Sequence, residues 1–413
     1  MSDILNGLNP QQKEAVMHTE GPLLILAGAG SGKTRVLTHR IAYLIENGFA
    51  EPEDILALTF TNKAAKEMKE RAASLTGKAA DKMLITTFHS ACVRFLKNRM
   101  MLLGYKRGNF VIYDTDEQKK IIRTIFEETG FQGRYPDIRV YDVISFISKQ
   151  KEKMLGPDEL ESIYPDYPLI TVYKEYERIL KKNNALDFDD LLWKTVQLFE
   201  NYPHILHSYQ EQFKYIMVDE YQDTNLVQFK IISMLADKYQ NLCVVGDDDQ
   251  SIYSFRGADI RNILEFEKEF QNTKVIKLEE NYRSTKNILS AANAVISHNQ
   301  ERKEKKLWTQ GEEGNKLRTI TLPDATTEAK FIVSEIERMH NREKADYKDF
   351  AILYRTNAQS RLFEQCLTMK DIPYRLVGAL SFFERKEVKD MLAYLRVLIN
   401  PDDDFGLERI INV

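Results

Sequence analysis

The chain has 413 residues, of which 43% are hydrophobic and 29% are charged, with a formal net charge of −4. This length exceeds what one hydrophobic core usually supports, so we expect several structural units. The overall charge excludes a chain that is basic throughout. A local excess of eight positive charges nevertheless lies between Phe60 and Arg107. That run has two interpretations, a solvated helical face or a surface that attracts nucleic acid.

The cysteines and histidines show no metal-binding pattern. Cys92, Cys243 and Cys366 lie far apart, and the seven histidines have no ligand spacing. We therefore expect neither zinc nor an iron–sulfur cluster, and no disulfide framework. The N-terminal residues lack the apolar core of a secretory signal, and no apolar run has the length of a membrane span. We expect a cytoplasmic protein with no membrane partner.

The predicted elements alternate between short apolar strands and amphipathic helices. After a helix over 10–18, strands are expected at 23–27, 55–59, 83–87, 214–220 and 241–247. This alternation is typical of an α/β protein built on a parallel sheet. Residues 113–213 are mostly helical and contain no clear parallel strand, which indicates a helical insertion into the first domain.

Beyond residue 281 the alternation restarts and predicts a second α/β unit. Its strands are expected at RTITL (318–322), FAILYR (350–355) and IPYRLV (372–377), and its helices at 326–340, 357–370 and 384–399. Three strands are fewer than an ordinary sheet contains, so this unit looks incomplete.

A phosphate-binding loop follows the first strand. The sequence AGAGSGKT (27–34) lies between a predicted strand and a predicted helix, which is the context that a P-loop requires. Its glycines let backbone N–H groups turn towards phosphate oxygens, Lys33 reaches the β- and γ-phosphates, and the Thr34 hydroxyl ligates Mg²⁺. Ala27 stands where the motif usually has its first glycine. The candidate ATP-binding residues here are Ala27, Gly28, Ala29, Gly30, Ser31, Gly32, Lys33, Thr34 and Arg35.

Two acids end the strand predicted at 214–220 and match this loop. Asp219 is expected to hold Mg²⁺, and Glu220 to accept a proton from attacking water. A helix N-cap is the alternative for acids at a strand end. Lys33 and Asp219 are 186 residues apart in the chain. That gap is too long for neighbouring strands of a simple nucleotide-binding domain, which supports the insertion.

The stretch GDDDQSIYSFRGAD (246–259) combines acids, an amide, aromatics and arginine. Because ligands lie at the carboxyl ends of parallel strands, Gln250 is expected near the γ-phosphate. Tyr253 and Phe255 suit stacking on unpaired bases, and Arg256 suits a phosphodiester or a carboxylate across a cleft. The alternative for Tyr253 and Phe255 is packing in an interdomain core.

These motifs together resemble a known family. DEYQDTN (219–225), ENYRST (280–285), AGAGSGKT and GDDDQSIYSFRGAD are similar to motifs of the bacterial UvrD/Rep/PcrA-type helicases of superfamily 1, and the PcrA branch resembles the chain most. Further matching segments, in chain order, are LNPQQKEAV (8–16), LTFTNKAAKEM (58–68), TTFHS (86–90), LDFDDLL (186–192) and YRTNAQSR (354–361).

The resemblance implies RecA-like domains with helical insertions. Domain 1A would comprise 1–108 and 186–280, insertion 1B 109–185, the first part of domain 2A 281–380, and the start of insertion 2B 381–413. The implied activity is ATP-dependent 3′→5′ movement on single-stranded DNA and unwinding of 3′-tailed duplexes, in DNA repair and replication.

The resemblance also implies residue roles. Gln12 would read the adenine edge, Tyr282 would stack on adenine, and Arg283 would reach the γ-phosphate from the second domain. With these, Lys33, Glu220 and Gln250 complete the expected catalytic set. The expected single-strand track comprises Phe60, Asn62, Thr87, His89, Tyr253, Phe255, Arg256 and Asn357.

Two features depart from the family pattern. Phe255 stands where the family usually has Trp, which predicts weaker base stacking. The family's motifs V and VI do not occur in the 413 residues, so we expect an N-terminal fragment with impaired hydrolysis. The alternatives are an ATP-responsive single-strand-binding module with little turnover, a P-loop enzyme for small molecules, and a helicase–nuclease fusion with its nuclease beyond residue 413.

Overall fold

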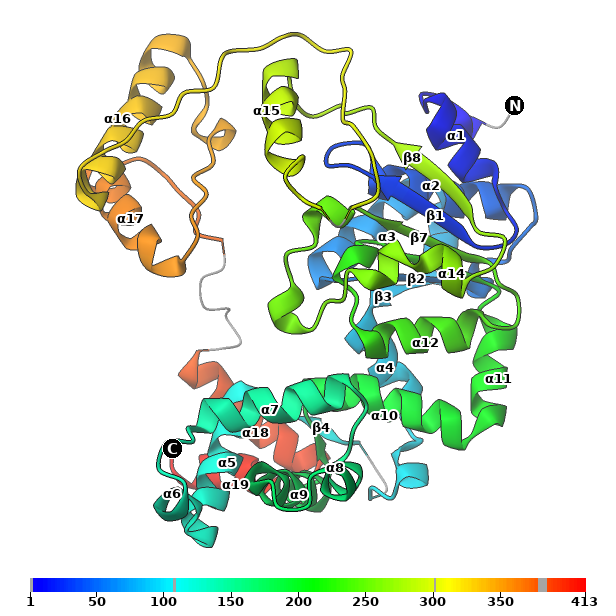
Figure 1. The fold of residues 1–413 in the computed structure, drawn as a ribbon, viewed down its shortest axis with the longest axis vertical. Helices are drawn as coiled ribbons and strands as arrows, with labels where there is room; N and C mark the ends of the chain where they lie inside the picture. The colour runs from blue at the N-terminus through cyan, green and yellow to red at the C-terminus, as the bar shows by residue number, and fades with distance from the viewer. Residues whose placement is uncertain (1–2, 107–108, 301, 378–384) are drawn as a thin grey trace. The chain divides into compact units, whose positions relative to one another are not determined.

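The computed structural model describes residues 3–106, 109–300, 302–377 and 385–413. The chain forms two compact units, residues 1–315 with 396–408 and residues 316–395 with 409–413. The first unit contains a six-stranded parallel sheet and many helices, which confirms the predicted α/β fold class (Figure 1).

The sheet has the strand order β3-β2-β6-β7-β1-β8, and every pair is parallel. Its strands are β1 (Leu23–Ala27), β2 (Ile55–Thr59), β3 (Leu84–Thr87), β6 (Tyr215–Val218), β7 (Leu242–Gly246) and β8 (Lys274–Leu278). Five of them match predicted strands, and β8 was not predicted. Two of its five residues, Lys274 and Lys277, are lysines, which hide the apolar pattern of an edge strand.

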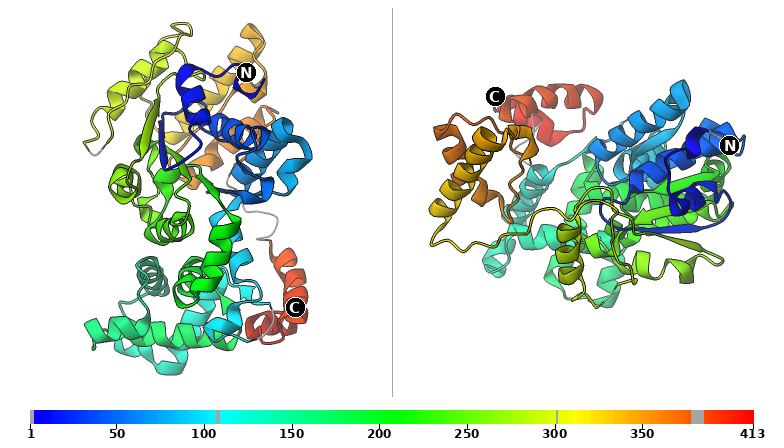
Figure 2. Two further views of the ribbon diagram at one scale, coloured as in Figure 1. Left: turned by 90° about the vertical axis from the view of Figure 1, so that its right-hand side faces the viewer. Right: turned by 90° about the horizontal axis from the view of Figure 1, so that it is seen from above.

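Helices cover both faces of the sheet, because successive strand side chains point to opposite sides. Leu23 and Ile25 pack with one group of helices, whereas Leu24 and Leu26 pack with the other. The first group is α1 (Pro10–Met17), α2 (Lys33–Glu46) and α3 (Asn62–Thr76). The second is α4 (Phe88–Leu96), α10 (Phe188–Asn201), α11 (Pro203–Gln212) and α12 (Leu226–Ala236). Figure 2 shows the same layers from two further directions.

A helical insertion with its own core interrupts this unit between α4 and α10. Its ends come together where β4 (Val111–Ile112) pairs with β5 (Ala185–Leu186). Each of these strands has only two residues, too few for the sequence to predict a strand. The helices are α5 (Thr115–Thr129), α6 (Phe131–Arg134), α7 (Val140–Glu152), α8 (Pro157–Ile163) and α9 (Pro168–Lys182). Ile121, Val143 and Tyr173 lie in the insertion core. The expected domain boundaries stay predictions.

Residues 396–408 pack on this insertion. The Tyr113 hydroxyl donates to the fully buried Asp403 carboxylate at 2.7 Å, and Arg396 pairs with Glu117 at 2.6 Å. The chain here spans the end of α18 (Lys386–Ile399) and most of α19 (Asp404–Ile411).

Among the residues described, the first unit contains three further α-helices after β7. They are α13 (Arg261–Leu264), α14 (Phe266–Glu269) and α15 (Lys286–Ile296).

The regular structure described in the second unit consists of helices. Its small core joins Val333, Leu367 and Ile372, from α16 (Ala325–Glu343), α17 (Ser360–Met369) and the residues after α17. The strands predicted at 318–322, 350–355 and 372–377 are wrong, because none of their described residues pairs in a sheet. Alternating apolar residues alone do not make a strand, which needs a neighbour for its backbone groups.

None of the helices in the described ranges is both long and apolar enough to cross a membrane. Cys92, Cys243 and Cys366 are free thiols. Burial raises the pKa of Cys92 to about 12 and that of Cys243 to about 11, which favours the inert, protonated form.

A buried ion cluster joins the insertion to α10. The Lys151 ammonium lies 2.7 Å from Glu177, 2.8 Å from Asp187 and 2.9 Å from Asp190, and its side chain is fully buried. Asp187 also caps α10 by accepting from the Asp190 N–H at 2.8 Å. The lysine therefore holds α7, α9 and the start of α10 together.

We predict that Lys151→Met lowers the free energy of unfolding by about 3–5 kcal/mol, because buried carboxylates lose their cation. Denaturant unfolding measures this change. The control is Lys174→Met, which removes an exposed lysine that pairs with Glu161 at 2.6 Å and should leave the midpoint almost unchanged. Equal midpoints for the two variants would mean that the buried cluster contributes no net stability.

Candidate functional site

The centre of the sheet brings three motifs to one edge. Strands β6, β7 and β1 are consecutive neighbours and run parallel, so their carboxyl ends lie side by side. The P-loop follows β1, Asp219 and Glu220 follow β6, and Asp247 follows β7. The edge therefore carries a phosphate loop next to three acids.

The P-loop has the backbone conformation that its glycines permit. Gly30 and Gly32 have φ values of 70° and 89°, in the left-handed region that L side chains avoid. Gly28 is needed for space, because an added Cβ would lie 2.1 Å from the Leu307 side chain. Ala27 is the buried last residue of β1, where a methyl group fits. The Ser31 hydroxyl donates to the Gly28 carbonyl at 2.7 Å and closes the loop.

The lysine and threonine of the loop contact the two acids after β6. Lys33 Nζ lies 2.9 Å from Glu220 Oε2, and the Thr34 hydroxyl donates to Asp219 at 3.1 Å. Burial and the neighbouring Glu220 raise the pKa of Asp219 to about 6. A buried carboxylate beside a hydroxyl is a donor pair that suits Mg²⁺, because the cation would offset the cost of burying the charge.

Glu220 is held in an unusual conformation. Its φ of 51° and ψ of 45° are left-handed, which is uncommon for a residue other than glycine and often marks a functional position. Its carboxylate also accepts from Gln222 Nε2 at 3.0 Å. Gln222 in turn accepts from the Asp247 N–H at 2.9 Å, so it joins the ends of β6 and β7. Sequence reasoning gave Gln222 no role, although it lies within DEYQDTN.

Gln12 and Tyr282 lie beside the loop. Gln12 is buried, donates to the Ser31 carbonyl at 2.9 Å and accepts from the Asn9 N–H at 3.1 Å, so it braces the P-loop. Tyr282 is exposed, and its hydroxyl bonds Asn9 and Glu280 at 2.9 and 2.7 Å. Their contacts with adenine stay predictions.

The two arginines near the loop differ in placement. Arg283 belongs to the same compact unit as the P-loop, and its Cβ lies 2.8 Å from the position of an added Cβ at Gly30. It thus lies in the first unit, whereas the sequence led us to expect it in the second domain. Arg35 lies on the exposed side of the first turn of α2, next to Gly7.

Four predicted track residues line one cavity of about 370 Å³ in the first unit. It is lined by Phe60, Thr61, Asn62, Thr87, His89, Ser90, Val93, Ile112, Phe188 and Leu191. Phe188 is half exposed and meets His89 edge to face at 5.9 Å. Burial lowers the pKa of His89, which favours its neutral ring. Phe188 was missed, although LDFDDLL signals it by placing an aromatic between helix-capping acids.

The aromatics of 246–259 lie next to this cavity. Tyr253 contacts Phe60 with ring centroids 5.3 Å apart and Phe255 at 5.9 Å. Phe255 is 74% exposed, so it does not pack in the core of the first unit. The Arg256 guanidinium lies 5.5 Å from the Tyr253 ring centroid. The result is a row of rings bordered by a cation.

Two further predicted features concern Asn357 and the basic residues of 60–107. Asn357 belongs to the second unit, where it begins the short helix Asn357–Gln359. Many basic residues of the 60–107 run are paired with acids on the surface, as in Lys63–Glu67 at 3.9 Å and Lys82–Glu53 at 3.1 Å. That pairing favours the solvated helical face for the α3 part of the run.

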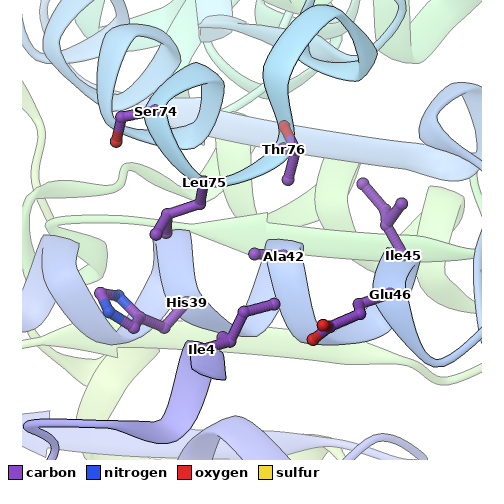
Figure 3. A pocket seen from close by; sticks show the side chains of 8 residues that line it. All are labelled: Ile4, His39, Ala42, Ile45, Glu46, Ser74, Leu75 and Thr76. Carbon is purple, nitrogen blue, oxygen red and sulfur yellow. The ribbon is translucent and has the colours of Figure 1, made fainter. Parts of the chain in front are cut away.

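Another cavity, of about 450 Å³, lies between the N-terminal turn, α2 and the end of α3 (Figure 3). It is lined by Ile4, His39, Ala42, Ile45, Glu46, Ser74, Leu75 and Thr76. Burial lowers the pKa of His39, and the lining contains no lysine or arginine that could hold a phosphate. This cavity does not include the P-loop or the strand ends.

Comparison with known proteins identifies the family. The family model for the UvrD/REP helicase N-terminal domain matches residues 8–271, and that for the UvrD-like helicase C-terminal domain matches residues 276–413. The chain is 50% identical over 415 residues to a Bacillus subtilis protein named ATP-dependent DNA helicase PcrA. It is also 50% identical over 416 residues to proteins of that name from Staphylococcus epidermidis and Staphylococcus aureus.

These matches cover 100% of the chain but 56% of each of these relatives, so the chain spans about half the length of the curated relatives it matches. The resemblance that the motifs indicated is confirmed over the whole chain. On the strength of both family models and these relatives, the chain belongs to the UvrD/Rep family of helicases.

Proposed function

We propose that this chain hydrolyses ATP with Mg²⁺ and uses the energy to move 3′→5′ along single-stranded DNA and unwind duplexes. The observation that carries the proposal is the loop after β7. It begins at the nucleotide edge with Asp247 and Gln250 and ends in the aromatic row with Tyr253 and Phe255. One short loop thus connects a hydrolytic site to a base-stacking surface.

For hydrolysis, an incoming triphosphate takes Lys33 from its ion pair with Glu220 and leaves that carboxylate free to accept a proton from water. Thr34 and Asp219 would hold Mg²⁺, which neutralises charge on the β- and γ-phosphates. Arg283, Tyr282 and Gln12 surround the same loop and are assigned to the γ-phosphate and the adenine.

For DNA, the track is assigned to the aromatic row and the cavity beside it. Phe60, Tyr253 and Phe255 offer ring faces for bases, and the half-exposed Phe188 extends them. Thr87, Asn62, His89 and Arg256 supply polar and charged groups, and Asn357 is assigned to the same strand from the second unit.

The finer parts of the proposal depend on the family. The relatives are named ATP-dependent DNA helicases, which favours DNA as the polymer. The 3′→5′ direction, the 3′-tailed duplex substrate and roles in DNA repair and replication follow from the motif resemblance. Action on DNA inside the cell accords with the expected cytoplasmic location.

We predict that Glu220→Gln lowers DNA-stimulated ATP turnover by roughly 10²-fold or more and leaves ATP binding intact, because the amide cannot accept the proton. Lys33→Ala should instead weaken ATP binding itself. Steady-state turnover with and without oligo-dT, beside equilibrium ATP binding, separates the two variants. If Glu220→Gln still shows full turnover, Glu220 is not the base. If the unaltered chain binds ATP and oligo-dT with negligible turnover, it acts as a binding module.

We predict that Phe255→Ala weakens oligo-dT binding by the roughly 1–3 kcal/mol that stacking contributes per base. Phe255→Trp should strengthen binding, because indole offers more stacking area. Ile252→Ala is the matched control, since Ile252 is an exposed apolar residue of the same loop. Fluorescence anisotropy of labelled oligo-dT measures all three affinities. Equal losses for the Phe255 and Ile252 variants would leave Phe255 without a stacking role.

We predict unwinding of 3′-tailed duplexes and none of 5′-tailed ones under the same ATP concentration. A strand-displacement assay on the two substrates tests the direction, with Glu220→Gln as the negative control. Preference for the 5′-tailed duplex would reverse the proposed polarity.

A further inference from the structure

A lysine occupies the centre of the acidic triplet after β7. The carboxylate oxygens of Asp247, Asp248 and Asp249 lie within 4.8 Å of one another. Lys305 Nζ is 2.9 Å from Asp247 and 2.8 Å from Asp249, and it also pairs with Asp248. The Lys305 side chain is 2% exposed, so this is a buried ammonium among three acids. The lysine ammonium therefore occupies the position that a metal ion would take among these three carboxylates.

Lys305 belongs to residues 302–308, which we call the strap. The strap makes further contacts with the same triplet, since Arg302 donates to Asp249 at 2.8 Å and the Lys303 N–H donates to Asp248 at 2.7 Å. Removing three buried carboxylates from water is costly unless cations and N–H groups compensate them. The strap supplies that compensation.

The strap also contacts the P-loop side of the site. The Leu307 side chain fills the space in front of Gly28, where a Cβ would lie 2.1 Å from it. Trp308 accepts from the Asn281 N–H at 2.7 Å, and Asn281 in turn donates to the Ala29 carbonyl. One segment of seven residues thus touches the phosphate loop and the loop after β7.

The triplet fixes the orientation of Gln250. The Gln250 side-chain NH₂ donates to the Asp247 carboxylate, and a carboxylate only accepts, so the amide nitrogen faces Asp247. Among the hydrogen bonds of the described residues, Gln250 Oε1 accepts none. Its carbonyl oxygen is thus left as an acceptor, which suits a water molecule rather than a phosphate oxygen.

We propose that Lys305 is a positioning residue for ATP hydrolysis. It neutralises the triplet, keeps Asp247 in place, and through Asp247 holds Gln250 with its carbonyl oxygen available to orient the attacking water. This inference rests on the proposed function, because it assigns Gln250 to that water. The three acids of GDDDQ thus bind the strap, while the aromatics and arginine follow them along the same loop.

The test is a double-mutant cycle on oligo-dT-stimulated turnover. We expect Lys305→Met to lower kcat by roughly tenfold or more and to change KM for ATP by less than about twofold. In a Gln250→Ala background, Lys305→Met should have little further effect, since both changes remove the same water contact. Lys306→Met is the matched control, because Lys306 is the exposed neighbour on the same strap. If the fold-losses in kcat of Lys305→Met and Gln250→Ala multiply in the double variant, the two residues act independently and the proposal is overturned.

Hydrogen exchange provides a second readout that needs neither ATP nor DNA. Lys305→Met should speed amide exchange in peptides covering 246–256 and leave those of the insertion unchanged, whereas Lys306→Met should alter neither. If the unaltered chain shows no DNA-stimulated turnover, the proposed function fails. Unchanged amide exchange over 246–256 in Lys305→Met would independently overturn the positioning role of Lys305. If Lys305→Met does not fold, Arg302→Met removes the other cation of the triplet and replaces it in both measurements.

Discussion

The parallel pairing of β6, β7 and β1 is the constraint on which the candidate site depends. Because all three strands run in one direction, the P-loop, the Asp219–Glu220 pair and the GDDDQ stretch emerge at the same edge. Long stretches of chain separate these motifs, and the helical insertion is accommodated by the short β4–β5 pairing at its base. The sheet therefore brings together motifs that are far apart in the sequence.

Lysines compensate carboxylates at this edge and also where the insertion meets α10. Lys33 pairs with Glu220, Lys305 with the aspartate triplet, and Lys151 with the acids at the start of α10. Lys151 and Lys305 lie among buried carboxylates that would otherwise repel one another, whereas Lys33 pairs with the partly exposed Glu220. The three lysines differ in whether a ligand can reach them. A bound phosphate would compete with Glu220 for Lys33, whereas Lys151 and Lys305 are enclosed by protein. Lys33 therefore suits a role in ligand binding, and Lys151 and Lys305 suit structural roles.

The loop from Gln250 to Arg256 explains how the proposed nucleotide and single-strand sites can be close without sharing ligands. Asp247 and Gln250 lie at the polar edge of the sheet, while Phe255 is exposed next to Tyr253, which in turn contacts Phe60. If a bound nucleotide displaces Gln250, only a few residues of chain separate that displacement from the rings of Tyr253 and Phe255. Coupling through so short a path needs no long-range network.

The sequence by itself determined the parts whose chemistry is local. The P-loop, the acids after β6, five strands of the sheet and the family could be predicted, because glycine spacing, apolar runs and motif order are properties of adjacent residues. The tertiary structure alone decided which distant groups meet: Lys305 with the triplet, Phe188 with His89, Gln222 between two strand ends, and β8 at the sheet edge. It also left the strands expected at 318–322, 350–355 and 372–377 without partners. The physical reason is that strand pairing and ion pairing are contacts between residues far apart in the chain, and their energy depends on a neighbour that local sequence does not specify.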